Sequence, residues 1–346
     1  MNRREFLKSA ALAGATSVVP SAGADDSSGP FVRFCVFSDL HYWPRCYPND
    51  STDFLDRILQ RAVDAKCDFV IHCGDMVHDC VKYRDFVDRY LDFGKVPTYY
   101  CLGNHEDEFQ THEETMRALR LEKEYYSFDV RGFRFIVTDP HWIRRNGELI
   151  HFSKWNWSGP NRQKGDEIYW LPPDQVDWLR ETIASSPYPC VVFSHESFER
   201  PVCCGGVRNQ EEVRRIFANA NRACPGKVRM AVNGHYHVDF LRLWDDVAYL
   251  DVNSANYFYS GRRHTAYPAD WVRNHGGASL TYAYDAPLSS VVTLYPGGRI
   301  TIDGSRANWC FGVRPEDGGH SGSLDGRPAT CVSQSADFCL TVGKRG

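Results

Sequence analysis

The fold is decided by one stretch near the N-terminus, Phe31-Val32-Arg33-Phe34-Cys35-Val36-Phe37-Ser38-Asp39-Leu40-His41. Its first seven residues are apolar except for one arginine, which predicts a strand, and polar side chains follow where that strand ends. Apolar residues between Phe54 and Val63 then recur at three-to-four spacing, which predicts a helix with one buried stripe. Further strands at 69–73 and 98–102, with a second helix at 81–91 between them, complete a βαβαβ opening. We therefore expect an α/β fold in which helices cover a central sheet.

The rest of the chain adds a hairpin, an aromatic excursion and a polar end. Arg131-Gly132 separates two apolar runs and predicts a hairpin, so the sheet is mixed. Residues 141–171 are dense in aromatics without a regular period, which predicts a cap or pocket wall, with disorder as the alternative. Helices at 173–183 and 211–220, strands at 190–193 and 228–232, and β-rich pairs at 240–252 and 290–302 follow. Residues 317–346 are polar and rich in Gly and Ser, which predicts a loosely ordered tail after a domain at 25–316. The aromatic residues of the excursion are Trp142, Trp155, Trp157, Tyr169 and Trp170.

The composition argues against some classes of partner, and the N-terminus resembles an export signal. The 346 residues are 42% hydrophobic with a net charge of −4, a globular composition that argues against a nucleic-acid polymer or an anionic membrane as partner. Arg3-Arg4 precedes Phe6-Leu7-Lys8, a short apolar run and Ala22-Gly23-Ala24, which resembles a twin-arginine signal over residues 1–24. That resemblance implies folded export to the periplasm or beyond the cell through the twin-arginine translocation machinery, without stable membrane association. An uncleaved membrane-anchoring N-terminus is the alternative.

The chain has 13 cysteines, which an exported protein could pair. Four of them lie in predicted strands, where we expect buried thiols: Cys35, Cys73, Cys101 and Cys190. The disulfide candidates in loop-like surroundings are Cys46, Cys80, Cys203, Cys204, Cys224, Cys310, Cys331 and Cys339.

Five short segments stand where predicted strands end, which is where sites are built in open α/β sheets. In a single such segment the polar side chain usually has its hydrogen bonds made and plays a structural role. Gathering many unpaired polar groups in one place costs free energy unless a metal ion compensates for them. Carboxylate, amide and imidazole ligands without thiolate suit two divalent ions such as Mn, Fe, Zn or Co, bridged by one carboxylate. Such a pair can hold a hydroxide nucleophile and clamp a phosphoryl group, while a separate acid serves the leaving oxygen. The segments are Asp39-Leu40-His41, Gly74-Asp75, Gly103-Asn104-His105-Glu106, Ser194-His195-Glu196 and Gly234-His235-Tyr236-His237.

In this order the five segments resemble the calcineurin-like metallophosphoesterase superfamily. The resemblance implies a two-sheet β-sandwich flanked by helices, and the 141–171 excursion would be an insertion in it. It implies one metal held by Asp39, His41, Asp75 and His237, and another held by Asp75, Asn104, His195 and His235. Asp75 would bridge the two, and His105 would be the general acid.

The chain also departs from the family pattern. His78 occupies a position where members commonly carry Asp or Tyr, so an iron(III)-tyrosinate enzyme is not expected. Asp79 could orient His105 or be a solvated loop acid. Asn256 and Tyr257 could contact substrate or close a turn, and the turn is favoured. For His141 and His151, ordinary surface placement is favoured over a substrate-facing role.

These observations predict an exported hydrolase of small phosphate mono- or diesters. Because the aromatic excursion could stack a base, a nucleotide or cyclic-nucleotide phosphodiesterase or pyrophosphatase is an alternative. A non-catalytic, metal-dependent anion-binding protein is a further alternative, although His105 has no ligand duty in the family pattern and is useful chiefly for turnover.

Overall fold

We analysed a computed structural model of the chain, which describes residues 31–44, 50–154, 163–200, 205–275, 277–324 and 326–342. The predicted signal at 1–24 lies outside these residues. So do Trp155 and Trp157 of the aromatic excursion and three of the disulfide candidates, Cys46, Cys203 and Cys204.

Two six-stranded sheets form the centre of the molecule. The first has the order β19 (Ala336–Cys339), β16 (Arg299–Gly304), β15 (Ser290–Leu294), β1 (Val32–Phe37), β2 (Phe69–His72) and β3 (Thr98–Tyr100). The second has the order β11 (Phe240–Trp244), β12 (Val247–Asp251), β10 (Val228–Asn233), β9 (Cys190–Phe193), β5 (Phe133–Val137) and β4 (Tyr126–Val130).

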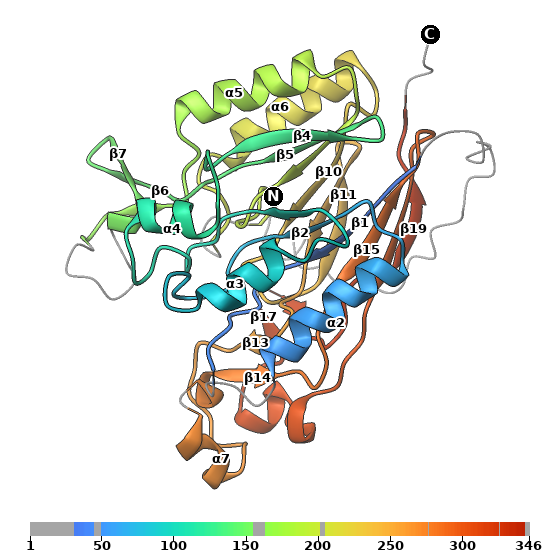
Figure 1. Cartoon of the computed structure of the whole chain (residues 1–346). Helices are drawn as coiled ribbons and strands as arrows, with labels where there is room; N and C mark the ends of the chain where they lie inside the picture. The colour runs from blue at the N-terminus through green and yellow to red at the C-terminus, as the bar shows by residue number, and fades with distance from the viewer. Residues whose placement is uncertain are drawn as a thin grey trace, which may run out of the picture.

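The sheets pack face to face between two layers of helices (Figure 1). Phe34 and Phe69 of the first sheet meet Phe135 and Phe193 of the second in one buried apolar cluster. Helices α2 (Ser51–Asp64) and α3 (Arg84–Leu91) bury their apolar stripes on the outer face of the first sheet, and α5 (Pro173–Ser185) and α6 (Gln210–Ala223) on that of the second. The predicted two-sheet sandwich flanked by helices is confirmed.

Parallel pairing brings the ends of the central strands to one edge. Strands β1, β2 and β3 run parallel in the first sheet, and β5, β9, β10 and β12 run parallel in the second. All of the segments singled out above follow one of these strands. The carboxyl ends of parallel strands share an edge, so both sheets deliver polar loops to the same side of the molecule.

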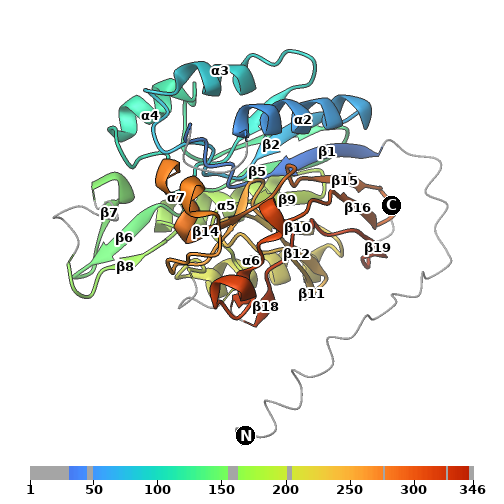
Figure 2. The ribbon, with the colours of Figure 1, turned by 90° about the horizontal axis from the view of Figure 1, so that it is seen from below.

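The described part of the 141–171 excursion is a small antiparallel sheet. It contains β6 (Trp142–Arg145), β7 (Glu148–His151) and β8 (Glu167–Ile168), with a 3₁₀ turn at Phe152–Lys154. Figure 1 shows β6 and β7 beside α4 (His112–Ala118), and Figure 2 shows β6, β7 and β8 together at one side of the molecule. Ordered structure here fits the predicted cap better than disorder.

The prediction of a loosely ordered tail from Asp317 is wrong. Strand β19 pairs with β16 and closes the edge of the first sheet, with Phe338 and Leu340 buried. The short strands β17 (Ser323–Leu324) and β18 (Arg327–Pro328) form a hairpin, and Arg327 of β18 pairs with Asp251 and Glu199. The segment is polar because an edge strand alternates buried and exposed residues, not because it lacks structure.

The prediction of buried cysteine thiols is confirmed, whereas the prediction of disulfides is not. The four strand cysteines are buried free thiols, as predicted. Cys80, Cys224, Cys310, Cys331 and Cys339 are also free, so the prediction of disulfides at these positions is wrong. Two of them, Cys80 and Cys310, are buried and act as small apolar side chains. Within the described ranges, none of the helices combines the length and apolar character needed to cross a bilayer.

Candidate metal centre

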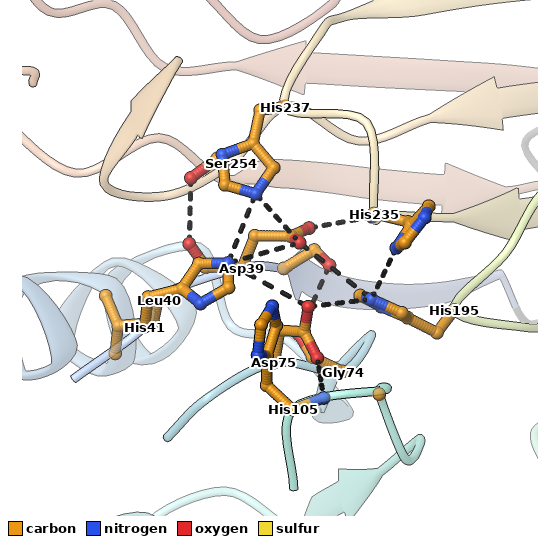
Figure 3. Close-up of polar contacts among 12 residues, drawn as sticks. Asp39, Leu40, His41, Gly74, Asp75, His105, His195, His235, His237 and Ser254 are labelled. Atoms are coloured by element: carbon orange, nitrogen blue, oxygen red, sulfur yellow. Dashed lines mark hydrogen bonds and ion pairs between the residues drawn. The ribbon is translucent and has the colours of Figure 1, made fainter. Parts of the chain in front are cut away.

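Six of the seven predicted ligands converge at the shared edge of the two sheets (Figure 3), and the seventh, Asn104, lines the same cavity as Asp75. Five of them have left-handed backbone conformations, with φ of 53° at Asp39, 48° at His41, 62° at Asp75, 71° at His235 and 53° at His237. Such values are uncommon for residues other than glycine and gather where function requires a strained turn. The chain therefore bends sharply after β1, β2 and β10 to aim these side chains inward.

One cluster joins β1 to β10. The His237 Nε2 atom lies 3.2 Å from Asp39 Oδ1 and 3.1 Å from His41 Nε2. Asp39 Oδ1 is buried without a hydrogen-bond partner, whereas Asp39 Oδ2 accepts from the backbone N–H of His235. His237 Nδ1 donates to the Tyr257 carbonyl, so its Nε2 lone pair faces the cluster. Three ligand atoms thus share one small space.

A second cluster joins β2 to β9 and β10. The His195 Nε2 atom lies 3.0 Å from Asp75 Oδ2 and 3.3 Å from His235 Nδ1. His195 Nδ1 donates to the Cys73 carbonyl at 2.6 Å, which again leaves Nε2 for the cluster. Asp75 Oδ2 is also 3.8 Å from His41 Nε2 of the first cluster. Asp75 therefore faces both clusters, the position that a bridging carboxylate requires.

Asn104 brings an amide oxygen to the same place. Its Oδ1 atom is buried without a hydrogen-bond partner. Buried polar atoms without partners are rare, and a cation in each cluster would satisfy Asp39 Oδ1 in the first and this oxygen in the second. The oxygen and nitrogen donors present suit a hard or borderline divalent ion, so the residues fit a pair of such ions.

Close packing fixes the loop that carries Asp75. A Cβ on Gly74, whose φ is +92°, would lie 2.7 Å from His195 Cγ, and one on Gly103 would lie 2.8 Å from Glu106 Oε2. Glu106 is completely buried and accepts from the backbone N–H groups of Asp75, Met76 and Gly103. Burial and the charge of Asp75 raise the pKa of Glu106 to about 7. Glu106 was assigned no role from the sequence, but these three hydrogen bonds show that it holds the turn.

The electrostatics of the clusters favour bound cations. Burial acts to raise the pKa of Asp39, but the imidazoles of His237 and His195 hold it well below its ordinary value. Burial is likewise outweighed at Asp75, where His195 is the strongest neighbour and the pKa again falls well below normal. Burial lowers the pKa of His41 to about 3. At His195 the charges of Asp75 and Asp39 overcome burial and raise the pKa to about 10.

His105 is oriented by Glu108, not by Asp79. Glu108 Oε2 accepts from His105 Nδ1 at 2.6 Å and from His78 Nδ1 at 2.7 Å. His78 Nε2 in turn lies 3.2 Å from His41 Nδ1, so His78 connects this carboxylate to a predicted ligand. Asp79 Oδ1 instead accepts from the backbone N–H of Lys82, which is the loop role that the sequence left open.

Three further residues have positions that the sequence left unsettled. Asn256 Nδ2 donates to the Leu40 carbonyl and is buried, so its role is structural, as favoured. His141 and His151 are both buried, and the prediction of ordinary surface placement for them is wrong. His141 bridges Asp139 and Glu196, a contact made only when three strand ends meet.

A cavity of about 770 Å³ opens over the clusters. Asp75, Asn104 and His105 line it at one end. Its walls combine aromatic and polar side chains from the residue after β8, the loop before α6, and the β13 (Tyr257–Tyr259) and β14 (Thr281–Ala283) pair with the turn that follows β13: Tyr169, Arg208, Tyr257, Tyr259, Ser260 and Thr281. Most of this wall lies outside the excursion to which the sequence assigned it.

Comparisons with known proteins bear on the family and the fold. The family model for calcineurin-like phosphoesterases matches residues 32–239. The crystal structure of a dimetal phosphatase from Danio rerio is similar in fold, with 14% identity, a TM-score of 0.54, and coverage of 90% of this chain and 99% of that one. A purple acid phosphatase from yellow lupin (Lupinus luteus) seeds shows 14% identity and a TM-score of 0.45 over 90% of this chain and 54% of that one. No curated protein matches the chain by sequence.

Proposed function

The chain belongs to the calcineurin-like phosphoesterase family, and from this premise we propose that it hydrolyses phosphate esters with two divalent ions at the centre described above. The observation that carries the proposal is the pair of three-residue clusters, Asp39 with His41 and His237 and Asp75 with His195 and His235, set side by side. Asp75 would bridge, and Asn104 would complete the second site.

The bound ions would supply a water of lowered pKa and neutralise charge on the phosphoryl oxygens. The chain's own residues supply the rest of the chemistry. His105 lines the cavity and uses Nδ1 to bind Glu108, so Nε2 is the nitrogen left to face a substrate. Burial acts against protonation, but the charge of Asp75 and the hydrogen bond to Glu108 raise the pKa of His105 above its ordinary value. His105 therefore holds the proton that the leaving oxygen needs.

The cavity suits an ester with an organic group as well as a phosphate. Tyr257 and Tyr259 present aromatic rings to it, and Arg208 adds a cation. Rings can stack on a planar leaving group, and a guanidinium can bind a second phosphate oxygen. We therefore keep two substrate classes, simple phosphate mono- or diesters and nucleotide diesters, the second favoured by these tyrosines.

The test begins with protein stripped by a chelator and resupplied with Mn, Fe, Zn or Co in turn. Turnover of p-nitrophenyl phosphate against bis-(p-nitrophenyl) phosphate, and of a nucleotide diester, ranks the substrate classes. We expect activity to return only with metal, and Asp75→Asn to lose both metal and turnover. Asp79→Asn, which changes a nearby acid that faces away, is the matched control. Metal-independent turnover, or turnover retained by Asp75→Asn, would contradict the proposal.

We also propose that the protein is exported through the twin-arginine pathway. The support is the Arg3-Arg4 pair with Phe6-Leu7-Lys8 behind it. Replacing both arginines by lysine should keep the protein in the cytoplasmic fraction, whereas the unchanged chain should reach the periplasm or medium. Equal fractionation of the two proteins would refute export by this route.

A further inference from the structure

A second group of acids and histidines lies beside the centre and takes no part in it. We call it the His151 cluster: Asp107, His112, Glu124, Asp139 and His151. These residues come from the β3–α4 loop, the start of α4, the segment before β4, the end of β5 and the end of β7. The ring centroids of His112 and His151 are 4.0 Å apart, so the cluster lies where the end of the β6–β7 hairpin meets the start of α4 (Figure 1).

Two buried atoms in this cluster point at each other without a hydrogen-bond partner. Asp139 is completely buried and His151 is 8% exposed, yet neither Asp139 Oδ2 nor His151 Nε2 has such a partner. The two atoms are 4.0 Å apart, too far for a hydrogen bond. Ligand atoms about 2.1 Å from one zinc ion lie roughly 3 to 4 Å apart, so an ion would fit between them.

Each of these residues is already oriented by other contacts. Gln175 binds both the backbone N–H and the carbonyl of Asp139, and Asp139 Oδ1 binds His141, so Oδ2 is held in place. His151 Nδ1 lies 2.8 Å from Ser153 Oγ, which leaves Nε2 as the ligating nitrogen. Fixed second contacts of this kind orient ligands at metal sites.

A third carboxylate completes the set. Glu124 offers an oxygen that lies, with Asp139 and His151, within a group whose ligand atoms are all within 4.8 Å of one another. The carboxylate can keep its contact with His112 at the same time, because only Oε1 binds His112 Nε2, at 2.7 Å. Two carboxylates and one imidazole, with room for water, suit a borderline divalent ion.

The charges in the cluster also call for a cation. Asp107, Glu124 and Asp139 bring three carboxylates, and within the described ranges no lysine or arginine pairs with them. His112 lies between two of them; burial opposes its charge, but hydrogen bonds to Asp107 and Glu124 raise its pKa to about 10. Burial lowers the pKa of His151, which favours the neutral imidazole that metals bind. Burial opposes the charge of His141 as well, but Glu196 and Asp139 raise its pKa well above its ordinary value. Two protonated histidines, His112 and His141, thus face these three carboxylates and Glu196, which leaves an excess of negative charge.

From this geometry we propose that Glu124, Asp139 and His151 bind a third divalent ion, separate from the two at the centre. The ion ties the β6–β7 hairpin to β5 and to the segment before β4. A chain of contacts connects this site to the centre. Asp139 contacts His141, His141 contacts Glu196, and Glu196 Oε1 is 3.9 Å from Nδ1 of the predicted ligand His235. The role of the third ion is to hold this insertion in position.

The test counts ions on the full chain. Stripped protein is titrated with zinc alone, freed of unbound zinc by gel filtration, and its metal content is measured. We expect three zinc ions per unchanged chain and two for His151→Gln. Glu122→Gln, which alters an exposed acid two positions from Glu124, should still bind three. Asp75→Asn should lose zinc from the centre but keep the ion at the His151 cluster, so failure of the two proposals can be told apart.

Anomalous diffraction at the zinc edge locates the third ion, and a peak between Asp139 Oδ2 and His151 Nε2 supports the proposal. Glu124→Gln is the second variant if His151→Gln does not fold, because Glu124 is half-buried and its loss is easier to tolerate. Two zinc ions on the unchanged chain would overturn the proposal. So would three on either cluster variant, or a third peak elsewhere.

Discussion

Replacing Glu108 by glutamine tests the way in which His105 is kept protonated. The substitution keeps the shape of the side chain and removes its charge. One oxygen of Glu108 now accepts from both His105 and His78, at 2.6 and 2.7 Å. Burial acts to raise the pKa of Glu108, but those two histidines outweigh it and lower the pKa to about 2, so the carboxylate is ionised at any working pH. The glutamine of the variant would offer a neutral acceptor instead.

The size of the effect follows from the type of hydrogen bond. A hydrogen bond to a charged group contributes about 1.5–3 kcal/mol, against roughly 0.5–1.5 for a neutral one. If the difference in free energy between the charged and the neutral hydrogen bond is lost from the transition state, kcat falls roughly tenfold, and about a hundredfold at most. The sign of the pH effect is also fixed. Glu108 raises the pKa of His105, so its loss lowers that pKa, and the alkaline limb of the kcat profile moves to lower pH.

The assay is a kcat–pH profile of both proteins with saturating substrate and metal. The difference should be largest on the alkaline side and should shrink as the pH falls, because at low pH His105 is protonated in both. Asp79→Asn should leave the profile unchanged, since Asp79 contacts the Lys82 backbone instead. A uniform loss at all pH values would mean that Glu108 is merely structural, and an unmoved alkaline limb would refute the reasoning.

Three other predictions concern metal binding, substrate and stability. Zinc binding at pH 7 should release about one proton, because Asp75 and Asp39 raise the pKa of His195 to about 10 against burial and this histidine must lose its proton to bind. The affinity for zinc should therefore rise with pH. Calorimetry in buffers of different ionisation enthalpy measures the proton release, and finding none would contradict this prediction. Tyr259→Ala should raise KM for aryl or nucleoside esters severalfold with little change in kcat, since the ring is half exposed on the cavity wall; an unchanged KM would remove it from the binding surface. Phe338→Ala should lower the free energy of unfolding by about 3 kcal/mol in denaturant titrations, whereas Cys339→Ser, at an exposed position, should change it by less than about 0.5. Equal stability of these two variants would mean that β19 adds little to the core.

Much of the fold and the positions of the ligands could be predicted because the signals were local. Each ligand follows an apolar run that is a strand in its own right, as Asp39 follows β1 and Asp75 follows β2. Parallel strands must end at a shared edge, so the order of segments along the chain already implied that they meet. That these seven side chains bind metal stays a prediction.

What escaped prediction depends on contacts between distant segments. Asp79 is as close in sequence to Asp75, the predicted bridge, as an orienting acid should be, but its side chain turns back to its own loop. Glu108 takes that position because the turn after Asn104 folds it onto two histidines. The surface placement predicted for His141 and His151 is wrong because their buried partners, Asp139 and Glu196 among them, meet them only once β5, β7 and β9 are assembled.

The left-handed residues at the centre have a practical consequence for anyone engineering this protein. Glycine adopts those dihedral angles readily, so exchanging Asp39 or Asp75 for glycine would relieve roughly 1 kcal/mol of backbone cost while removing a metal-facing group. Laboratory selection for heat resistance alone would therefore tend to enrich inert variants. If the proposed centre holds metal, a stabilisation campaign needs turnover as a second criterion at every round, because the substitutions that relieve the backbone remove its predicted ligands.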